Sequence, residues 1–146
     1  LPGPTGERNT WTLMPRTRVL CVADNEEDAL IQLAAVTAVG SRALWPDEPM
    51  QRELAKRLPQ SVSQRIDFAT ADKLFSQPFD AVIFHGDSDQ LRKLCEFVAA
   101  RDGAIVTVQG FAHGETNLLL ERLYVERSLS VNTAAAGGNA SLMTIG

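Results

Sequence analysis

The residues best suited to chemistry in this sequence gather around two histidines. His85 precedes Asp87 and Asp89, a grouping from which a metal site or part of a catalytic triad could be built. We expect a simpler role, because no fourth ligand accompanies them and Asp87 or Ser88 is well placed to cap a helix. His113 lies in a glycine-bounded segment that we predict to be an exposed loop. We therefore assign no catalytic residue, no metal ligand and no cofactor-binding residue to this chain.

The two cysteines indicate no reactive site either. Cys21 and Cys95 lack the spacing of a CxxC motif, and both stand in apolar surroundings. We predict two reduced, buried thiols in a cytoplasmic protein, with neither a disulfide nor a nucleophile.

Composition sets a broad frame for the function. The 146 residues are 45% hydrophobic and 22% charged, as is typical of one globular domain. The formal net charge of −4 argues against a nucleic-acid partner. No apolar run is long enough to cross a membrane, so we expect no membrane insertion. Because the sequence starts at Leu1 and not at methionine, we expect it to be part of a longer protein.

Short apolar runs alternate with helical patterns through the centre of the chain. We predict strands at residues 19–23, 43–45, 65–68, 80–84 and 104–108. The helices between them end near Gly40, Pro59 and Gly103. This alternation predicts an α/β fold, a Rossmann-like parallel sheet with helices on both faces, followed by a strand or extended tail.

Three regions follow from this pattern. Residues 1–15 are rich in proline and glycine, so we predict a linker that follows a preceding module. Residues 16–116 form the predicted Rossmann-like domain. Residues 117–146 form a C-terminal docking motif, because no charge follows Arg127 and the end of the tail is apolar. A tail without charges can be buried without leaving an ion unpaired. The docking residues that we predict are Ser128, Leu129, Ser130, Val131, Asn132, Thr133, Gly137, Gly138, Asn139, Leu142, Met143 and Ile145.

A dinucleotide site is the obvious function for such a sheet, and the turn after the first strand tests it. Pyrophosphate binding needs glycines there, so that backbone N–H groups approach the anion. The turn reads Ala23-Asp24-Asn25-Glu26-Glu27-Asp28, with four carboxylates and no glycine. These residues therefore predict no dinucleotide site.

Three segments resemble the nucleotide-binding domain of aldehyde dehydrogenases. They are Leu33 to Pro46, Phe84 to Ser88 and Ile105 to Gly110, in the same order and spacing as in that superfamily. Where the superfamily has its ribose-binding lysine, this chain has Trp45. Asp87 and Leu91 stand where its pyrophosphate turn has serine and glycine, and Val108 where it has the general-base glutamate. The resemblance therefore implies the fold without NAD binding or aldehyde oxidation.

Two terminal segments are similar to the longer members of the proline utilisation A family. They are Leu1 to Asn9 and Glu121 to Gly146, the latter matching the motif that ends those proteins. The resemblance implies a parent with an FAD-dependent proline dehydrogenase module and an NAD-dependent L-glutamate γ-semialdehyde dehydrogenase module. This segment would be a non-catalytic lid over the cavity that channels pyrroline-5-carboxylate. Its partners would be those two modules, with a second subunit left open, and the parent would be cytoplasmic or peripheral at the bacterial inner membrane.

Two other functions stay open. One is a residual nucleotide- or metabolite-binding domain that uses the crevice at the carboxyl ends of the strands. Trp45, Asp87 and Leu91 argue against it. The other is a homo-oligomerisation element, because the same uncharged tail could dock on a neighbouring subunit.

Overall fold

The computed structural model describes residues 7–132. The described chain divides into two compact units. One is the α/β unit, Pro15 to Val125, and the other consists of the described residues before and after it.

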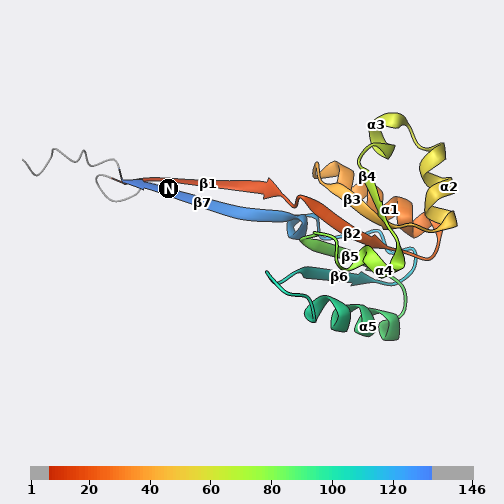
Figure 1. Cartoon of the computed structure of the whole chain (residues 1–146). Coiled ribbons are helices and arrows are strands. Elements are labelled where there is room, and N and C mark those ends of the chain that lie inside the picture. Colours follow the sequence, from red (N-terminus) through yellow and green to blue (C-terminus); the bar gives the residue numbers. More distant parts are fainter. Residues whose placement is uncertain (1–6, 133–146) are drawn as a thin grey trace, which may run out of the picture. The chain divides into compact units, whose positions relative to one another are not determined.

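The α/β unit contains a five-stranded parallel sheet, as the sequence predicted (Figure 1). In spatial order the strands are β4 (Ile66–Ala69), β3 (Arg42–Pro46), β2 (Arg18–Val22), β5 (Ala81–His85) and β6 (Thr107–Phe111). The central strand β2 pairs with β3 on one side and with β5 on the other, so that Val19 lies between Ala43 and Ala81.

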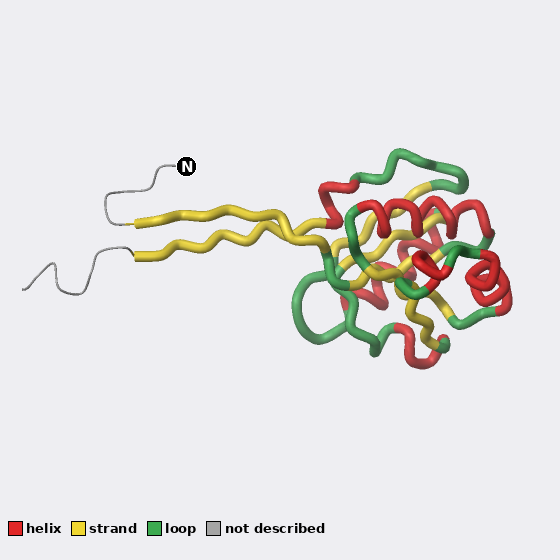
Figure 2. The backbone as a smooth tube through the Cα atoms, turned by 90° about the horizontal axis from the view of Figure 1, so that it is seen from above, coloured by secondary structure: helices red, strands yellow, loops and turns green. Residues whose placement is uncertain are grey.

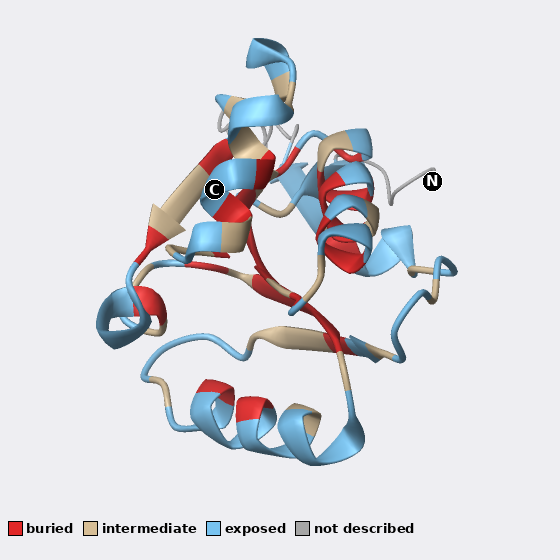
Figure 3. Cartoon of the chain, turned by 90° about the vertical axis from the view of Figure 1, so that its right-hand side faces the viewer, coloured by how far each residue is buried: buried red, intermediate tan, exposed pale blue. Residues whose placement is uncertain are grey.

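Helices cover both faces of the sheet. They are α1 (Glu26–Ala38), α2 (Pro49–Arg57), α3 (Gln60–Ser63), α4 (Ala71–Leu74) and α5 (Ser88–Ala99), with a 3-10 turn η1 (Leu120–Leu123). Figure 3 shows that burial is concentrated in the central strands and on the sides of α1 and α5 that face the sheet. This is the arrangement in which strands are apolar on both faces.

Successive residues of each strand supply two separate cores, because side chains alternate across the sheet. The core on the α1 and α2 side is built from residues such as Val19, Val36, Trp45, Ile83 and Leu123. The core on the α4 and α5 side is built from Leu20, Leu44, Val82, Phe84 and Leu94. Each fully buried aliphatic side chain stabilises the fold by about 1.5–3 kcal/mol.

The last strand of the sheet corrects one prediction. A strand was expected at residues 104–108, but β6 begins at Thr107 and ends at Phe111. Pairing sets this register, since Thr107 lies opposite Ala81 and Phe111 opposite His85. Ile105 lies before the strand and is 97% exposed. The prediction from the apolar run alone therefore put the start of the strand too early in the sequence.

The second unit is a ribbon of two strands, which we call the β1–β7 ribbon. Within the described residues, β1 (Glu7–Pro15) and β7 (Tyr124–Asn132) pair with each other as a two-stranded sheet (Figures 1 and 2). The hydroxyl of Thr10 donates to the carbonyl of Leu129, and that of Thr12 to the carbonyl of Arg127. As the residue number rises along β1, that of its partner on β7 falls, so the two strands are antiparallel.

The ribbon differs from the expected linker and tail. The segment predicted as a linker contains the nine-residue strand β1. The strand predicted from Ser128 onward exists, but it begins at Tyr124 and its partner is β1 of the same chain. Residues 117–125, which we assigned to the tail, group with the α/β unit, and Leu123 is fully buried in its core. In the part of the chain described, no helix is long and apolar enough to cross a membrane.

Candidate functional site

The crevice of the α/β unit lies where the carboxyl ends of β2 and β5 meet. The chain runs from β2 to β3 and β4 on one side, and later to β5 and β6 on the other. Ligands of such sheets bind at this switch point, outside the carboxyl ends of the strands. Three segments converge there: the start of α1 after β2, His85 at the end of β5, and residues 112–115 after β6.

Asp28, in the first turn of α1, is the centre of this crevice. It is fully buried, and its carboxylate accepts hydrogen bonds from Asn25 Nδ2 (2.6 Å) and from the backbone N–H of Gly114 (2.8 Å). Its Oδ2 also lies 2.7 Å from Nδ1 of His113. Burial by itself disfavours the charged carboxylate, but these hydrogen bonds outweigh it and lower the pKa of Asp28. We call these contacts the Asp28 latch, because they tie the loop after β6 to α1.

His113 is the exposed half of this latch. Its side chain is 51% exposed, in agreement with a loop position, but the ring is bound by a buried carboxylate that the sequence did not indicate. The hydrogen bond to Asp28 raises the pKa of His113, and the charges of Asp24, Asp28 and Asp87 act in the same direction. Asp24 lies 3.6 Å from Nδ1.

His85 is bound on both ring nitrogens. Nδ1 accepts from Gln32 Nε2 (2.9 Å), which also donates to the carbonyl of Val22. Nε2 lies 2.9 Å from the carbonyl of Glu115, so the tautomer with its proton on Nε2 satisfies both contacts. The ring is buried and stacks on Phe111. His85 therefore fastens the loop after β6 a second time.

The N-terminus of α5, the second helix at the crevice, is closed by its own side chains. Asp87 Oδ1 accepts from the backbone N–H groups of Asp89 (2.9 Å) and Gln90 (2.8 Å). The Gln90 side chain accepts in return from the Asp87 N–H, which completes a capping box. The expected capping role of Asp87 is thus confirmed. Asn25 caps α1 in the same way through the N–H of Asp28.

The turn that resembles a phosphate-binding turn is filled with side chains. A Cβ on Gly86 would lie 2.5 Å from the Phe84 ring and 2.6 Å from Gln90 Oε1. The side chain of Leu91 occupies the space in which a Cβ on Gly110 would lie. The glycines here make room for side chains of this same domain.

The remaining positions of the resemblance lie in or near the core. Trp45 is buried on the α1 side and meets Phe68 edge-on. Val108 is half-buried against the core on the α5 side.

One group of side chains has the composition of a metal site. Ligand atoms of Asp24, Asp28 and His113 lie within 4.8 Å of one another, which is close enough for one ion. Asp28, however, already accepts from two N–H donors and contacts the His113 ring. The hydrogen bonds account for the grouping, and we assign no metal ion to it.

The cysteines differ from each other. Cys21 is buried, and burial raises the pKa of its thiol far above the ordinary value. Cys95 is exposed on α5, so the prediction of a second buried thiol was wrong. The helix turns Cys95 away from the core, although its neighbour Leu94 is buried.

Five of the twelve predicted docking residues lie on β7. They are Ser128, Leu129, Ser130, Val131 and Asn132, all exposed. The other seven lie outside the described residues: Thr133, Gly137, Gly138, Asn139, Leu142, Met143 and Ile145.

The opposite strand carries residues that sequence reasoning missed. Trp11, Leu13 and Met14 of β1 are exposed, with Trp11 at 60%. The alternation of Thr10, Trp11, Thr12 and Leu13 was the available signal. A hollow of about 740 Å³ lies on the ribbon, lined by Asn9, Thr10, Trp11, Ser128, Leu129 and Ser130.

Comparison with solved structures supports the class that the fold indicates. A crystal structure of a bifunctional proline utilization A protein matches 77% of this chain and 13% of its own, with a TM-score of 0.56 and 24% identity. An aldehyde dehydrogenase from Pseudomonas aeruginosa matches 78% of this chain and 26% of its own, with a TM-score of 0.55 and 16% identity. The chain thus has the α/β fold found in the aldehyde dehydrogenase superfamily. No family model matches it.

Sequence comparison is more specific. The bifunctional protein PutA of Escherichia coli is 76% identical over 146 residues, all of this chain and 11% of that protein. The PutA of Klebsiella aerogenes is 80% identical over 137 residues, 94% of this chain and 10% of that protein. The PutA of Rhizobium meliloti is 41% identical over 152 residues, all of this chain and 12% of that protein. The chain is a PutA segment, and it spans about a tenth of the length of these relatives.

Proposed function

We propose that this chain is a non-catalytic domain of a bifunctional enzyme that oxidises proline to glutamate. It serves as a lid and docking module that supports the passage of pyrroline-5-carboxylate between the other modules and the activity of the aldehyde dehydrogenase module. FAD and NAD belong to those modules in this proposal, and this segment binds neither.

The observation that carries the proposal is the apolar surface of the β1–β7 ribbon. A two-stranded ribbon is marginally stable by itself in water. This one exposes Trp11, Leu13 and Met14 on β1, and Leu129 and Val131 on β7. Trp11 and Leu13 lie on one face of β1, as Leu129 and Val131 lie on one face of β7, because side chains two residues apart in a strand point the same way. Exposed apolar groups of this kind mark interaction sites. No third strand pairs with β1 or β7 among residues 7–132, and their outer backbone edges offer hydrogen-bond donors and acceptors to a partner strand.

The crevice supports the non-catalytic half of the proposal. Backbone N–H groups at both helix N-termini that would receive a phosphate already donate to a cap: that of Asp28 to Asn25, and those of Asp89 and Gln90 to Asp87. The loop after β6 is fastened there by Asp28 and His85. A residual nucleotide-binding domain, the first alternative, would have to displace these contacts.

The test is coupled turnover of proline to glutamate by the full-length PutA that carries this segment. We expect Trp11→Ser combined with Leu129→Ser to leave proline dehydrogenase activity intact and to introduce a lag in NADH formation. The matched control is Phe97→Ser on α5, because Phe97 is as exposed as Trp11, at 60% each. Equal lags in both variants, or none in either, would contradict the docking role.

The homo-oligomerisation alternative uses the same ribbon. Sedimentation of the wild-type enzyme and of the Trp11→Ser, Leu129→Ser double variant distinguishes docking within one chain from homo-oligomerisation. If the wild-type and variant enzymes form assemblies of equal mass and only the variant shows the lag, the result supports docking within one chain. If the variant forms an assembly of smaller mass, the ribbon joins subunits.

A further inference from the structure

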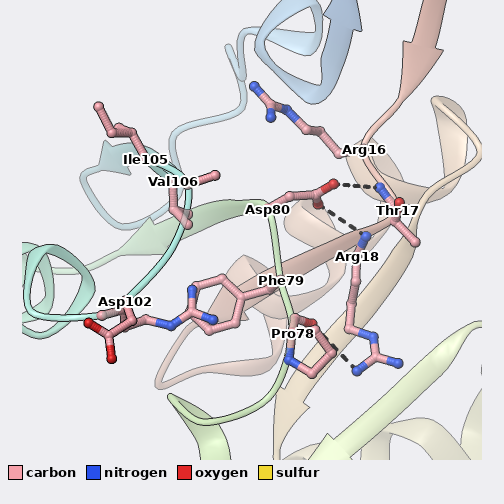
Figure 4. Close-up of a pocket in the computed structure, with 11 residues that line it drawn as sticks. Arg16, Thr17, Arg18, Pro78, Phe79, Asp80, Asp102, Ile105 and Val106 are labelled. Carbon is pink, nitrogen blue, oxygen red and sulfur yellow. Dashed lines mark hydrogen bonds between the residues drawn. The ribbon is translucent and has the colours of Figure 1, made fainter.

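A second hollow lies at the amino-terminal ends of the strands, at the opposite end of the sheet from the crevice. It has a volume of about 440 Å³ and opens where β2, β5 and β6 begin (Figure 4). Residues 16–18, 78–80 and 101–106 line it. Much of the lining is apolar, with the buried ring of Phe79 on one side and Ile105 on the other, whose side chain is almost fully exposed. The volume is that of a small-molecule site.

Arg16 is the polar group in this hollow that lacks an adequate partner. Its Nε is buried and makes no hydrogen bond. Nη2 reaches only the hydroxyl of Thr107, at 3.4 Å. No carboxylate pairs with it among residues 7–132. An unsatisfied buried donor costs about 1–3 kcal/mol, and more when it is charged, so an acceptor at this place would be favoured.

Arg101 adds a second positive charge without a carboxylate partner in the described chain. Its guanidinium stacks on Phe79 at 3.7 Å from the ring centroid. Nε and Nη2 donate to the carbonyls of Phe75 and Gln77. These bonds hold the side chain in place but leave its charge uncompensated.

The lining holds three further charged groups. Asp80 accepts from the backbone N–H groups of Thr17 and Arg18, but its negative charge, like the positive charge of Arg101, has no ionic partner among residues 7–132. The Arg18 side chain pairs with Asp67 and points away from Arg16 in Figure 4. Asp102 is exposed, and its charge repels a dianion about twice as strongly as a monoanion.

We propose that this hollow binds a small organic monoanion, a carboxylate with an apolar body. The carboxylate pairs with Arg16, and the body lies between Phe79 and Ile105. A guanidinium favours carboxylates because its N–H groups match their two oxygens. Asp102 biases the site against phosphate.

Titration of the 146-residue chain with sodium benzoate tests the site, with the neutral isostere benzamide as a matched probe. We expect saturable binding of benzoate at one site by calorimetry, and much weaker binding of benzamide. Arg16→Gln should weaken benzoate binding about tenfold or more. Arg92→Gln is the control, because Arg92 is an exposed arginine on α5 that pairs with Asp89 outside the hollow. Its benzoate affinity should be unchanged.

A second variant guards against an effect of Arg16→Gln on folding. Ile105→Glu changes a side chain with almost no packing, so the fold should be retained, and the new charge at the rim should weaken benzoate binding as well. The proposal is overturned if no saturable binding occurs, if Arg16→Gln binds like the wild type, or if benzamide or inorganic phosphate binds as tightly as benzoate.

Discussion

Asp28 and His113 are 85 residues apart in sequence, yet their side chains meet at 2.7 Å over the crevice of the sheet. One partner is buried and the other is half-exposed. The pair fastens the loop after β6 to the first turn of α1, and the N–H of Gly114 reinforces it. The stability of this loop should therefore depend on the charge of both groups.

The pH dependence follows from the two shifts. The raised pKa of His113 gives a contribution that is complete below the ordinary value of 6.5 and is lost as pH rises through the folded-state pKa. The lowered pKa of Asp28 gives a contribution that is present above the ordinary value of 3.8 and is lost as pH falls through its folded-state pKa. The difference in urea midpoint between wild type and His113→Ala should thus be largest between these two values. A difference that stays constant from pH 4 to 9 would contradict the charge-assisted latch.

Removal of the buried carboxylate should destabilise the α/β unit. Asp28→Asn places an amide N–H₂ where donors already point, so we expect a loss of about 1–3 kcal/mol in the free energy of unfolding. Asp24→Asn is the control, since Asp24 is exposed and should stay within about 0.5 kcal/mol of the wild type. Chemical denaturation at pH 6 measures both. Equal losses would mean that burial of Asp28 is not what matters.

The contact between Leu91 and Gly110 can be tested by a double-mutant cycle. Gly110→Ala places a Cβ in the space that the Leu91 side chain fills, and overpacking of this kind costs about 1–3 kcal/mol. Leu91→Ala should relieve that cost, so the double variant should be no less stable than Leu91→Ala alone. The coupling energy should be about 0.5–3 kcal/mol. A neutral Gly110→Ala would show that Leu91 moves aside freely.

Removal of the Asp87 carboxylate alone should not create a nucleotide site. Asp87→Ser keeps a capping hydroxyl and removes the carboxylate, so stability should change by less than about 1 kcal/mol. We expect NAD to leave the melting temperature unchanged in the wild type and in this variant, because the Asp28 latch and Leu91 remain. An NAD-dependent rise in the wild type would favour the residual ligand-binding function.

The two thiols should differ in reactivity. Cys95 is exposed, whereas Cys21 is buried and its thiol has a raised pKa, so it lacks the thiolate that reacts. A disulfide reagent should label one thiol per folded chain and two after denaturation. Cys95→Ser should abolish the fast reaction. Rapid labelling of Cys21 in the folded chain would indicate frequent opening of the core.

Much of the fold could be predicted because local signals and burial agree. Gly40 has φ of +86° just after α1, where a helix needs a residue without a Cβ. Pro59 ends α2 in the same predictable way. The central strands are apolar on both faces, so their position and their parallel pairing followed from the sequence.

The misses have a common physical cause, which is pairing over long sequence distance. β1 contains exposed apolar residues between polar ones, and its partner β7 is more than a hundred residues away. Asp28 looked like an ordinary acidic residue of a first helical turn, because nothing near it in sequence reveals His113 and Gly114. The start of β6 depended on its register with β5. Such contacts are specified by tertiary structure and leave no local pattern.

The self-capped helix termini also bear on how such a domain could change over evolutionary time. A phosphate needs free N–H groups at α1 or α5, and here Asn25 already uses that of Asp28, and Asp87 that of Gln90. Loss of either cap lowers stability by about 1 kcal/mol before any affinity is gained. Leu91 and the Asp28 latch would have to change as well. Each of these changes removes a stabilising contact before a phosphate site is complete, so selection for stability would oppose such a path step by step.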